Sequence, residues 1–198
     1  MLNKNRWAEL IATFFFIGKI RYCPGTFGSL VSFPLYYIII YFIRLNQVVF
    51  LSSSNIVEQQ AFTDFFIITF ICLLLFIIGS YFTSVYVKYT NIDDPKEVVI
   101  DEVVGQMLTI TLCSFSVEFA LYSKIAEYLS TQIIELIFLV IMPFCLFRLF
   151  DIIKPWPINW CDQNIHGGIG VMLDDILAAV FASVAQYALF FCVINWLE

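Results

Sequence analysis

Charged residues are scarce in this chain of 198 amino acids. They make up only 13% of the sequence, while hydrophobic residues make up 61% and the mean hydropathy is +0.89. A soluble domain is typically about one quarter charged, so this deficit excludes an ordinary soluble protein and predicts an integral membrane protein. Because a few spanning helices use up most of the length, we predict a single domain covering 1–198.

Positive charge is the rarer sign, since ten basic residues stand against sixteen acidic ones and the formal net charge is −6. A net acidic body does not attract nucleic acid or an anionic surface, so neither is expected as the main partner.

Cysteine motifs are missing as well. The six cysteines include no pair two or three residues apart, which argues against a zinc site or a disulfide framework, and none precedes an arginine by five residues, as a cysteine-phosphatase loop requires.

Long apolar runs predict the fold. A spanning helix needs about 20 largely apolar residues, and two runs meet this cleanly while three weaker ones are interrupted by proline or glutamate. We predict an all-α polytopic membrane helical bundle of about four or five spanning helices, with a short N-terminal interfacial or re-entrant helix at 10–17. The candidate spans are 29–43, 65–87, 103–121, 128–147 and 176–197.

The distribution of lysine and arginine predicts the orientation. Four basic residues precede the first span, and the following connections and tail hold one, two, one, two and none. Cytoplasmic connections collect such residues, so we predict the N-terminus inside and the C-terminus outside. This topology places the conspicuous acidic clusters and the only histidine on the cytoplasmic face. The polar stretch 47–63 is expected to be a solvated connector without chemistry.

Three acidic clusters lie where apolar runs begin or end: Asp101 with Glu102, Asp151, and Asp174 with Asp175. Carboxylates are costly inside a bilayer and adjacent like charges repel, so these clusters predict chain segments that converge on Mg²⁺ or Ca²⁺. Neighbouring helical residues point about 100° apart, so the first pair shares an ion only near a helix end or against a second helix, which Gly105 would admit. The alternative is that these two acids complement a helix dipole.

The segment 21–29, just before the first span, is rich in turn residues. A proline, two glycines and two hydroxyl side chains can form an anion cradle, with close backbone approach at the glycines. The alternative is a tight turn entering a membrane helix, with Ser29 as its cap. The candidate substrate-binding residues in this segment are Pro24, Gly25, Thr26, Gly28 and Ser29.

A second candidate phosphate-binding segment lies at 147–168. Arg148, Asp151 and Lys154 are spaced three residues apart, so one helical face can present a carboxylate between two cations that suit a phosphate. A positive-inside loop with tryptophan anchors would explain the cations but not the acid. Further along, His166 stands in a glycine-rich stretch, where it either has a structural role or transfers a proton.

Four sequence blocks together resemble the phosphatidylglycerophosphatase A family, and they extend over most of the chain. The last two, with their KPWPI and HGGxGxMxDD patterns, are the most specific. The blocks are PGTFGS at 24–29, IDEVVGQ at 100–106, RLFDIIKPWPI at 148–158 and DQNIHGGIGVMLDDILAA at 162–179. The family often has glycine where Ala179 stands, a change that we expect to affect only helix packing.

The resemblance implies a Mg²⁺-dependent lipid phosphatase of the bacterial inner membrane, which hydrolyses phosphatidylglycerophosphate to phosphatidylglycerol and phosphate. We expect the acidic pairs to hold one or two Mg²⁺ ions, Arg148 or Lys154 to clamp the phosphate, and His166 to move a proton; water and an aspartate both stay open as nucleophile. No obligatory protein partner is expected. The implied acidic positions, candidates for both catalysis and metal binding, are Asp101, Glu102, Asp151, Asp174 and Asp175.

Two other functions are compatible with the sequence. A small ion carrier or channel subunit would use its acids to line a polar path, but this reading expects charges near the middle of spans, where only Glu118 and Glu135 come close. An inactive structural membrane subunit is the other possibility. Release of phosphate from a phosphorylated lipid, with and without EDTA, separates all three.

Overall fold

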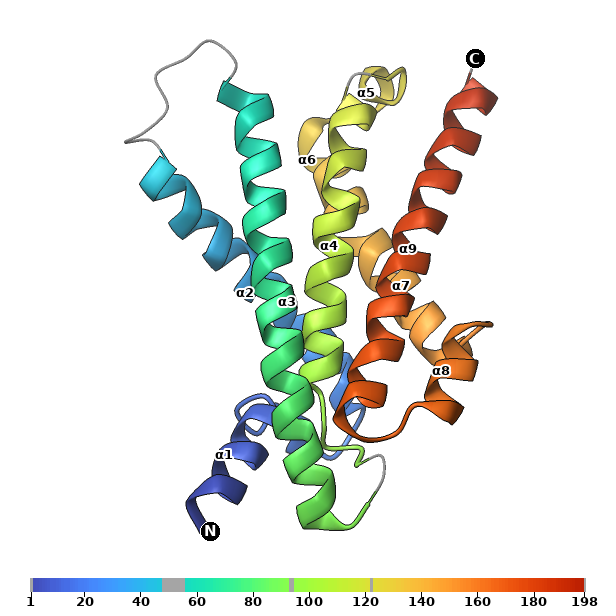
Figure 1. The fold of residues 1–198 in the computed structure, drawn as a ribbon. Helices are drawn as coiled ribbons and strands as arrows, with labels where there is room; N and C mark the ends of the chain where they lie inside the picture. The colour runs from blue at the N-terminus through green and yellow to red at the C-terminus, as the bar shows by residue number, and fades with distance from the viewer. Residues whose placement is uncertain (1, 48–55, 93–94, 122, 198) are drawn as a thin grey trace.

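A computed structural model describes residues 2–47, 56–92, 95–121 and 123–197, and they form helices without any strand (Figure 1). This confirms the predicted all-α class. The long elements are α2 (Pro24–Gln47), α3 (Ile56–Thr90), α4 (Ile100–Leu121) and α9 (Gly167–Leu197). The shorter ones are α1 (Leu2–Ala12), η1 (Ile17–Lys19), α5 (Ile125–Tyr128), α6 (Thr131–Glu135), the π-helical η2 (Leu136–Ile141), α7 (Met142–Ile153) and α8 (Ile158–Asn164).

Five helical segments are long and apolar enough to cross a membrane, and they match the five predicted spans. Four of them lie within the long helices, and the fourth span in chain order is a composite of α6, η2 and α7. The four long helices all begin earlier than the predicted spans. For α2 at Pro24 and α9 at Gly167 the reason is that proline is well suited to a first helical turn and the glycines there do not break the helix. The segments are Pro24–Asn46, Gln60–Thr90, Ile100–Glu118, Thr131–Ile153 and Gly167–Trp196.

Helix α4 occupies the centre of the bundle, where it lies between α3 and α9 and also contacts α2 and α7 (Figure 1). Two thirds of its spanning segment (67%) is buried, against 17% for α3, so α4 meets protein where α3 meets lipid. Its hydroxyl side chains suit this position because they bond to their own helix: Thr109 Oγ1 donates to the Gly105 carbonyl at 2.8 Å and Thr111 Oγ1 to that of Met107 at 2.8 Å.

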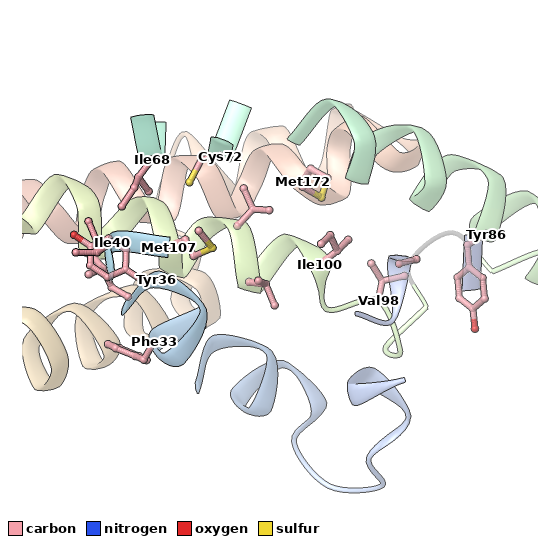
Figure 2. Close-up of a cluster of buried hydrophobic side chains, with 14 of the residues drawn as sticks. Phe33, Tyr36, Ile40, Ile68, Cys72, Tyr86, Val98, Ile100, Met107 and Met172 are labelled. Carbon is pink, nitrogen blue, oxygen red and sulfur yellow. The ribbon is translucent and has the colours of Figure 1, made fainter. Parts of the chain in front are cut away.

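A cluster of buried apolar side chains joins the central helices (Figure 2). Phe33, Tyr36 and Ile40 share one face of α2 at helical spacing, and Ile68 and Cys72 of α3 belong to the same cluster. Met107 of α4 lies in the same cluster, as does Met172 of α9. This packing fixes the long helices relative to one another, and with them the ends that carry the acidic residues.

The N-terminal helix differs in its limits from the prediction at 10–17. Helix α1 ends at Ala12, and the chain then turns through Phe14, Phe15 and Phe16, all with positive φ. The turn is held from outside, because the Val99 N–H donates to the Ala12 carbonyl at 3.0 Å. In Figure 1, α1 lies at the end of the bundle opposite to the C-terminal end of α9. The expected connector 47–63 falls partly outside the described residues, and its part from Ile56 onward is helical rather than a loop.

Candidate active site

A cavity of about 480 Å³ lies where α2, α4 and α9 begin and where α7 ends. All five predicted acidic positions line it, together with Arg148, Lys154 and His166. Residues as far apart in the chain as Cys23 and Asp175 therefore meet at one end of the bundle. The first turns of three helices point their positive dipole ends toward this cavity, which favours carboxylates and phosphate there.

Three of the acids form a compact group. One carboxylate oxygen from each of Asp101, Glu102 and Asp175 lies within 4.8 Å of the other two. Asp175 is 3% exposed, and two buried oxygens, Glu102 Oε2 and Asp175 Oδ2, have no hydrogen-bond partner among the described residues. Carboxylates so close together repel one another unless a cation or a proton intervenes. This group therefore has the chemistry of a divalent cation site.

Helix α9 is the second helix that faces the adjacent acids of α4, as sharing one ion requires. A Cβ atom on Gly105 would lie 3.0 Å from the Asp175 carbonyl oxygen and 2.8 Å from the Phe147 ring, so the absence of a side chain lets α4 approach α9 and α7 closely. The sequence predicted the acids of α9 at the beginning of the last span. They lie instead two turns inside that helix, which begins at Gly167. The glycine-rich stretch before them is itself helical.

Asp151 and Asp174 line the cavity but stand outside the compact group of three, and each forms an ion pair with a basic residue of the cavity lining. Arg148 Nη1 lies 2.6 Å from Asp151 Oδ2 and 3.9 Å from Glu102 Oε1, which confirms the expected pairing at i, i+3. The guanidinium thus connects the end of α7 to the carboxylate group on α4.

Lys154 does not pair with Asp151, so the expected helical face with one carboxylate between two cations is wrong. Helix α7 ends at Ile153, and Lys154 adopts a left-handed conformation with φ 46° that turns its side chain toward α8 and α9. Its Nζ donates to Asp174 Oδ2 at 2.5 Å and to Asp162 Oδ1 at 2.6 Å. Burial alone lowers the pKa of Lys154, but the hydrogen bonds and charges of these two carboxylates outweigh it and hold that pKa above its ordinary value.

Most of the segment 21–29 is helical, because α2 begins at Pro24 and only residues 21–23 precede it. Pro24, Gly25 and Thr26 line the cavity, and a Cβ atom on Gly25 would overlap Glu102 Oε1, so the backbone approaches the acids closely there. Gly28 and Ser29 lie outside the cavity lining. Gly28 packs against Val99, and Ser29 is buried within the helix, where its Oγ donates to the Gly25 carbonyl at 3.0 Å, so it caps nothing.

His166 lies at the edge of the cavity, exposed and directly before the first residue of α9. Two further charged residues of the lining, Lys96 and Asp162, were not among the predicted site residues. A signal was present for Asp162, which lies within the fourth sequence block. Lys96 belongs to no block, and only its position four residues before α4 could have suggested it.

The comparisons with known proteins agree with this geometry. The family model for phosphatidylglycerophosphatase A matches residues 10–190, a range that contains every residue of the cavity lining. The chain belongs to the phosphatidylglycerophosphatase A family. No solved structure matches the chain.

Individual relatives of the phosphatidylglycerophosphatase A family cover nearly the whole chain. Phosphatidylglycerophosphatase A of Escherichia coli is 28% identical over 183 residues, which are 92% of this chain and 83% of that protein. The protein of the same name from Haemophilus influenzae is 29% identical over 91% of this chain and 87% of its own length. A Bacteroides thetaiotaomicron protein named putative phosphatidylinositol-3-phosphatase is 28% identical over 88% of each chain.

Proposed function

We propose that this protein hydrolyses the terminal phosphomonoester of phosphatidylglycerophosphate, releasing phosphatidylglycerol and inorganic phosphate, and that it requires Mg²⁺. The observation that carries the proposal is the compact group of Asp101, Glu102 and Asp175, contributed by two helices and flanked by Arg148 and Lys154, in a member of this family. All five predicted acids line this one cavity, which argues against an ion carrier because they gather at one end of the bundle and not along a path through it.

The residues present fit Mg²⁺, an ion that prefers oxygen ligands and keeps several waters. Asp101, Glu102 and Asp175 would hold it, and the two buried oxygens without a hydrogen-bond partner are the donors that such an ion would use. When bound, Mg²⁺ neutralises phosphate charge and lowers the pKa of a coordinated water.

The cations of the cavity would bind the phosphate oxygens of the lipid. The Arg148 guanidinium offers a planar pair of donors and the Lys154 ammonium a point charge, and both face the cavity from the end of α7. Hydrolysis breaks the bond between phosphorus and the glycerol oxygen, and that oxygen needs a proton. His166, exposed at the cavity edge, is placed to supply it.

The surroundings of the cavity suit a lipid substrate at the cytoplasmic face of the inner membrane. Ile152 lines the cavity and is 71% exposed, and the neighbouring Trp156 is 79% exposed, so the rim is apolar where acyl chains would remain in the bilayer. The basic residues support the orientation: only Arg44 and Lys124 of the ten lie at the other end of the bundle.

Phosphate release by the purified protein tests this function. Phosphatidylglycerophosphate, phosphatidic acid and phosphatidylinositol 3-phosphate are compared in mixed micelles, first with EDTA and then after Mg²⁺ is restored. We expect the fastest release from phosphatidylglycerophosphate, loss of release with EDTA and recovery with Mg²⁺. Faster release from phosphatidylinositol 3-phosphate would assign a different substrate, and undiminished release in EDTA would remove the metal from the proposal.

A further inference from the structure

A second cavity, of about 630 Å³, lies between α1 and the C-terminal part of α3 and shares no residue with the candidate active site. Its lining mixes cationic, hydroxyl and aromatic side chains. The lining residues are Lys4, Asn5, Tyr81, Ser84, Val85, Lys88 and Tyr89.

The charge of the lining of this second cavity is positive. Both of its charged residues, Lys4 and Lys88, are lysines, and the described lining includes no acid. Neither lysine forms an ion pair with a described residue, whereas four of the other eight basic residues do. Lys4 Nζ lies 5.3 Å from the centre of the Tyr81 ring, which orients the ammonium without neutralising it. In a protein of net charge −6, two free cations beside one cavity indicate an anionic ligand.

The position of the second cavity along the membrane normal indicates that the anionic ligand is a lipid. The spanning segment of α3 has 31 residues, Gln60–Thr90, which at 1.5 Å per residue measure about 46 Å and exceed the hydrocarbon core of about 30 Å. Lys88 and Tyr89 are in the last turn of that segment, so they reach the layer of lipid headgroups. Tyr81 and Tyr89 are 53% and 60% exposed, as expected of an interfacial aromatic belt.

We propose that this cavity binds the headgroup phosphate of an anionic membrane phospholipid such as phosphatidylglycerol, held between Lys4 and Lys88, as a site separate from the active site. The tyrosine rings and Val85 would contact the glycerol and upper acyl chains, which a free phosphate ion lacks. A lipid bound there would contact both α1 and α3, which together line this cavity.

The second cavity also adjoins the contact that positions α9. Ser84 Oγ donates to the Ser80 carbonyl at 2.8 Å and accepts from the Gly168 N–H at 3.0 Å. A Cβ atom on Gly168 would overlap the Ser80 carbonyl oxygen, so the first turn of α9 lies directly on α3. A lipid that braces this part of α3 would therefore stabilise the end of the bundle that carries His166 and the acids of α9.

The test measures lipid retention and thermal stability, so it is independent of the proposed phosphatase activity. Protein is reconstituted in nanodiscs of phosphatidylcholine with or without phosphatidylglycerol, and the lipids that stay bound are identified by native mass spectrometry. The test variant is Lys4→Gln with Lys88→Gln. The control is Arg6→Gln with Arg21→Gln, which removes the same charge from the same face of the membrane at exposed residues outside both cavities.

We expect the wild type and the control to retain phosphatidylglycerol and to unfold at a higher temperature with it than in phosphatidylcholine alone. The Lys4→Gln, Lys88→Gln variant should bind it roughly tenfold or more weakly and lose the thermal shift. Inorganic phosphate should produce no shift in any variant. Equal retention by all three proteins, or a shift with inorganic phosphate alone, would overturn the proposal.

Discussion

The two ends of this helical bundle both place an arginine and several carboxylates in a polar cavity, yet only one of them has the geometry of a metal site. At the end opposite the candidate active site, a cavity of about 290 Å³, here called the distal pocket, is lined in part by Arg44, Asp64, Glu118 and Glu135. Arg44 Nε donates to Asp64 Oδ2 at 3.2 Å. Among the described residues, only the acids of the active-site end bring three carboxylates within 4.8 Å.

The difference lies in the helices that contribute the acids. In the candidate active site the carboxylates come from adjoining turns of α4 and α9, which approach each other closely at Gly105. In the distal pocket they come from α3, α4 and α6, and Glu135 is exposed. The number of acidic residues in a membrane bundle is thus a weak indication of catalysis. Their convergence, which depends on helix packing, is the stronger one.

The largest expected effect contrasts one carboxylate from each end. Asp175→Asn removes a charge from the compact group, and phosphate release should fall by more than about 100-fold, the upper range for residues that only support a metal ligand. Glu135→Gln removes the same charge from the distal pocket and should leave release within about twofold. Phosphate release under saturating Mg²⁺ measures both. Comparable losses in the two variants would erase the distinction between the two ends.

The second prediction exchanges the arginines. Arg148→Lys keeps the charge but loses the planar guanidinium, whose Nη1 lies near both Asp151 and Glu102 and whose other donors can bind phosphate, and phosphate release should fall on the order of tenfold or more. Arg44→Lys at the distal pocket still allows the single ion pair with Asp64 and should retain nearly full release. The ratio kcat/KM for phosphatidylglycerophosphate is the measurement. A normal value for Arg148→Lys would mean that the guanidinium does not bind the phosphate.

The sequence was sufficient for the spans and for the convergence of the acids. Apolar length alone predicts helices, and acids at the ends of apolar runs can avoid the bilayer core only by gathering at its surfaces. Helix ends were harder to predict, because the glycines and prolines that usually mark turns begin α2 at Pro24 and α9 at Gly167. As a result Ser29, predicted to be a cap or part of an anion cradle, lies inside a helix.

The ion pairs of Lys154 could not be predicted from the sequence. Lys154 was expected to continue the face of α7, but the left-handed turn at this residue directs its ammonium toward Asp162 and Asp174. The backbone conformation of this one residue determines which carboxylates Lys154 binds, and residue spacing in the sequence does not predict that conformation. The ion pair of Asp174 depends on this turn, whereas that of Asp151 forms within α7, with Arg148.

The third prediction concerns stability at two close helix contacts. Gly105→Ala places a Cβ atom 2.8 Å from the rigid Phe147 ring and 3.0 Å from the Asp175 backbone carbonyl, so α4 must move from α9; we expect about 1–3 kcal/mol lower stability. Gly79→Ala places its Cβ atom 2.9 Å from the end of the Met172 side chain, which can rotate away, and should cost less. Equilibrium unfolding in mixed micelles checks the order, and an equal loss in both would contradict it.

The smallest effect concerns Lys154. Its ammonium binds two carboxylates, whereas Arg44 binds one, and its side chain is only partly buried. Lys154→Gln should lower the free energy of unfolding by about 1 kcal/mol, because solvent screens the pair in part. The pKa of Lys154 is raised in the folded protein, so its contribution is complete below the ordinary lysine pKa and is lost only as the pH rises through the higher folded value. The difference between wild type and variant, followed by equilibrium unfolding in mixed micelles, should therefore be the same at about pH 8 and about pH 9. A difference that disappears between these two pH values would show that the ammonium is not held by Asp162 and Asp174.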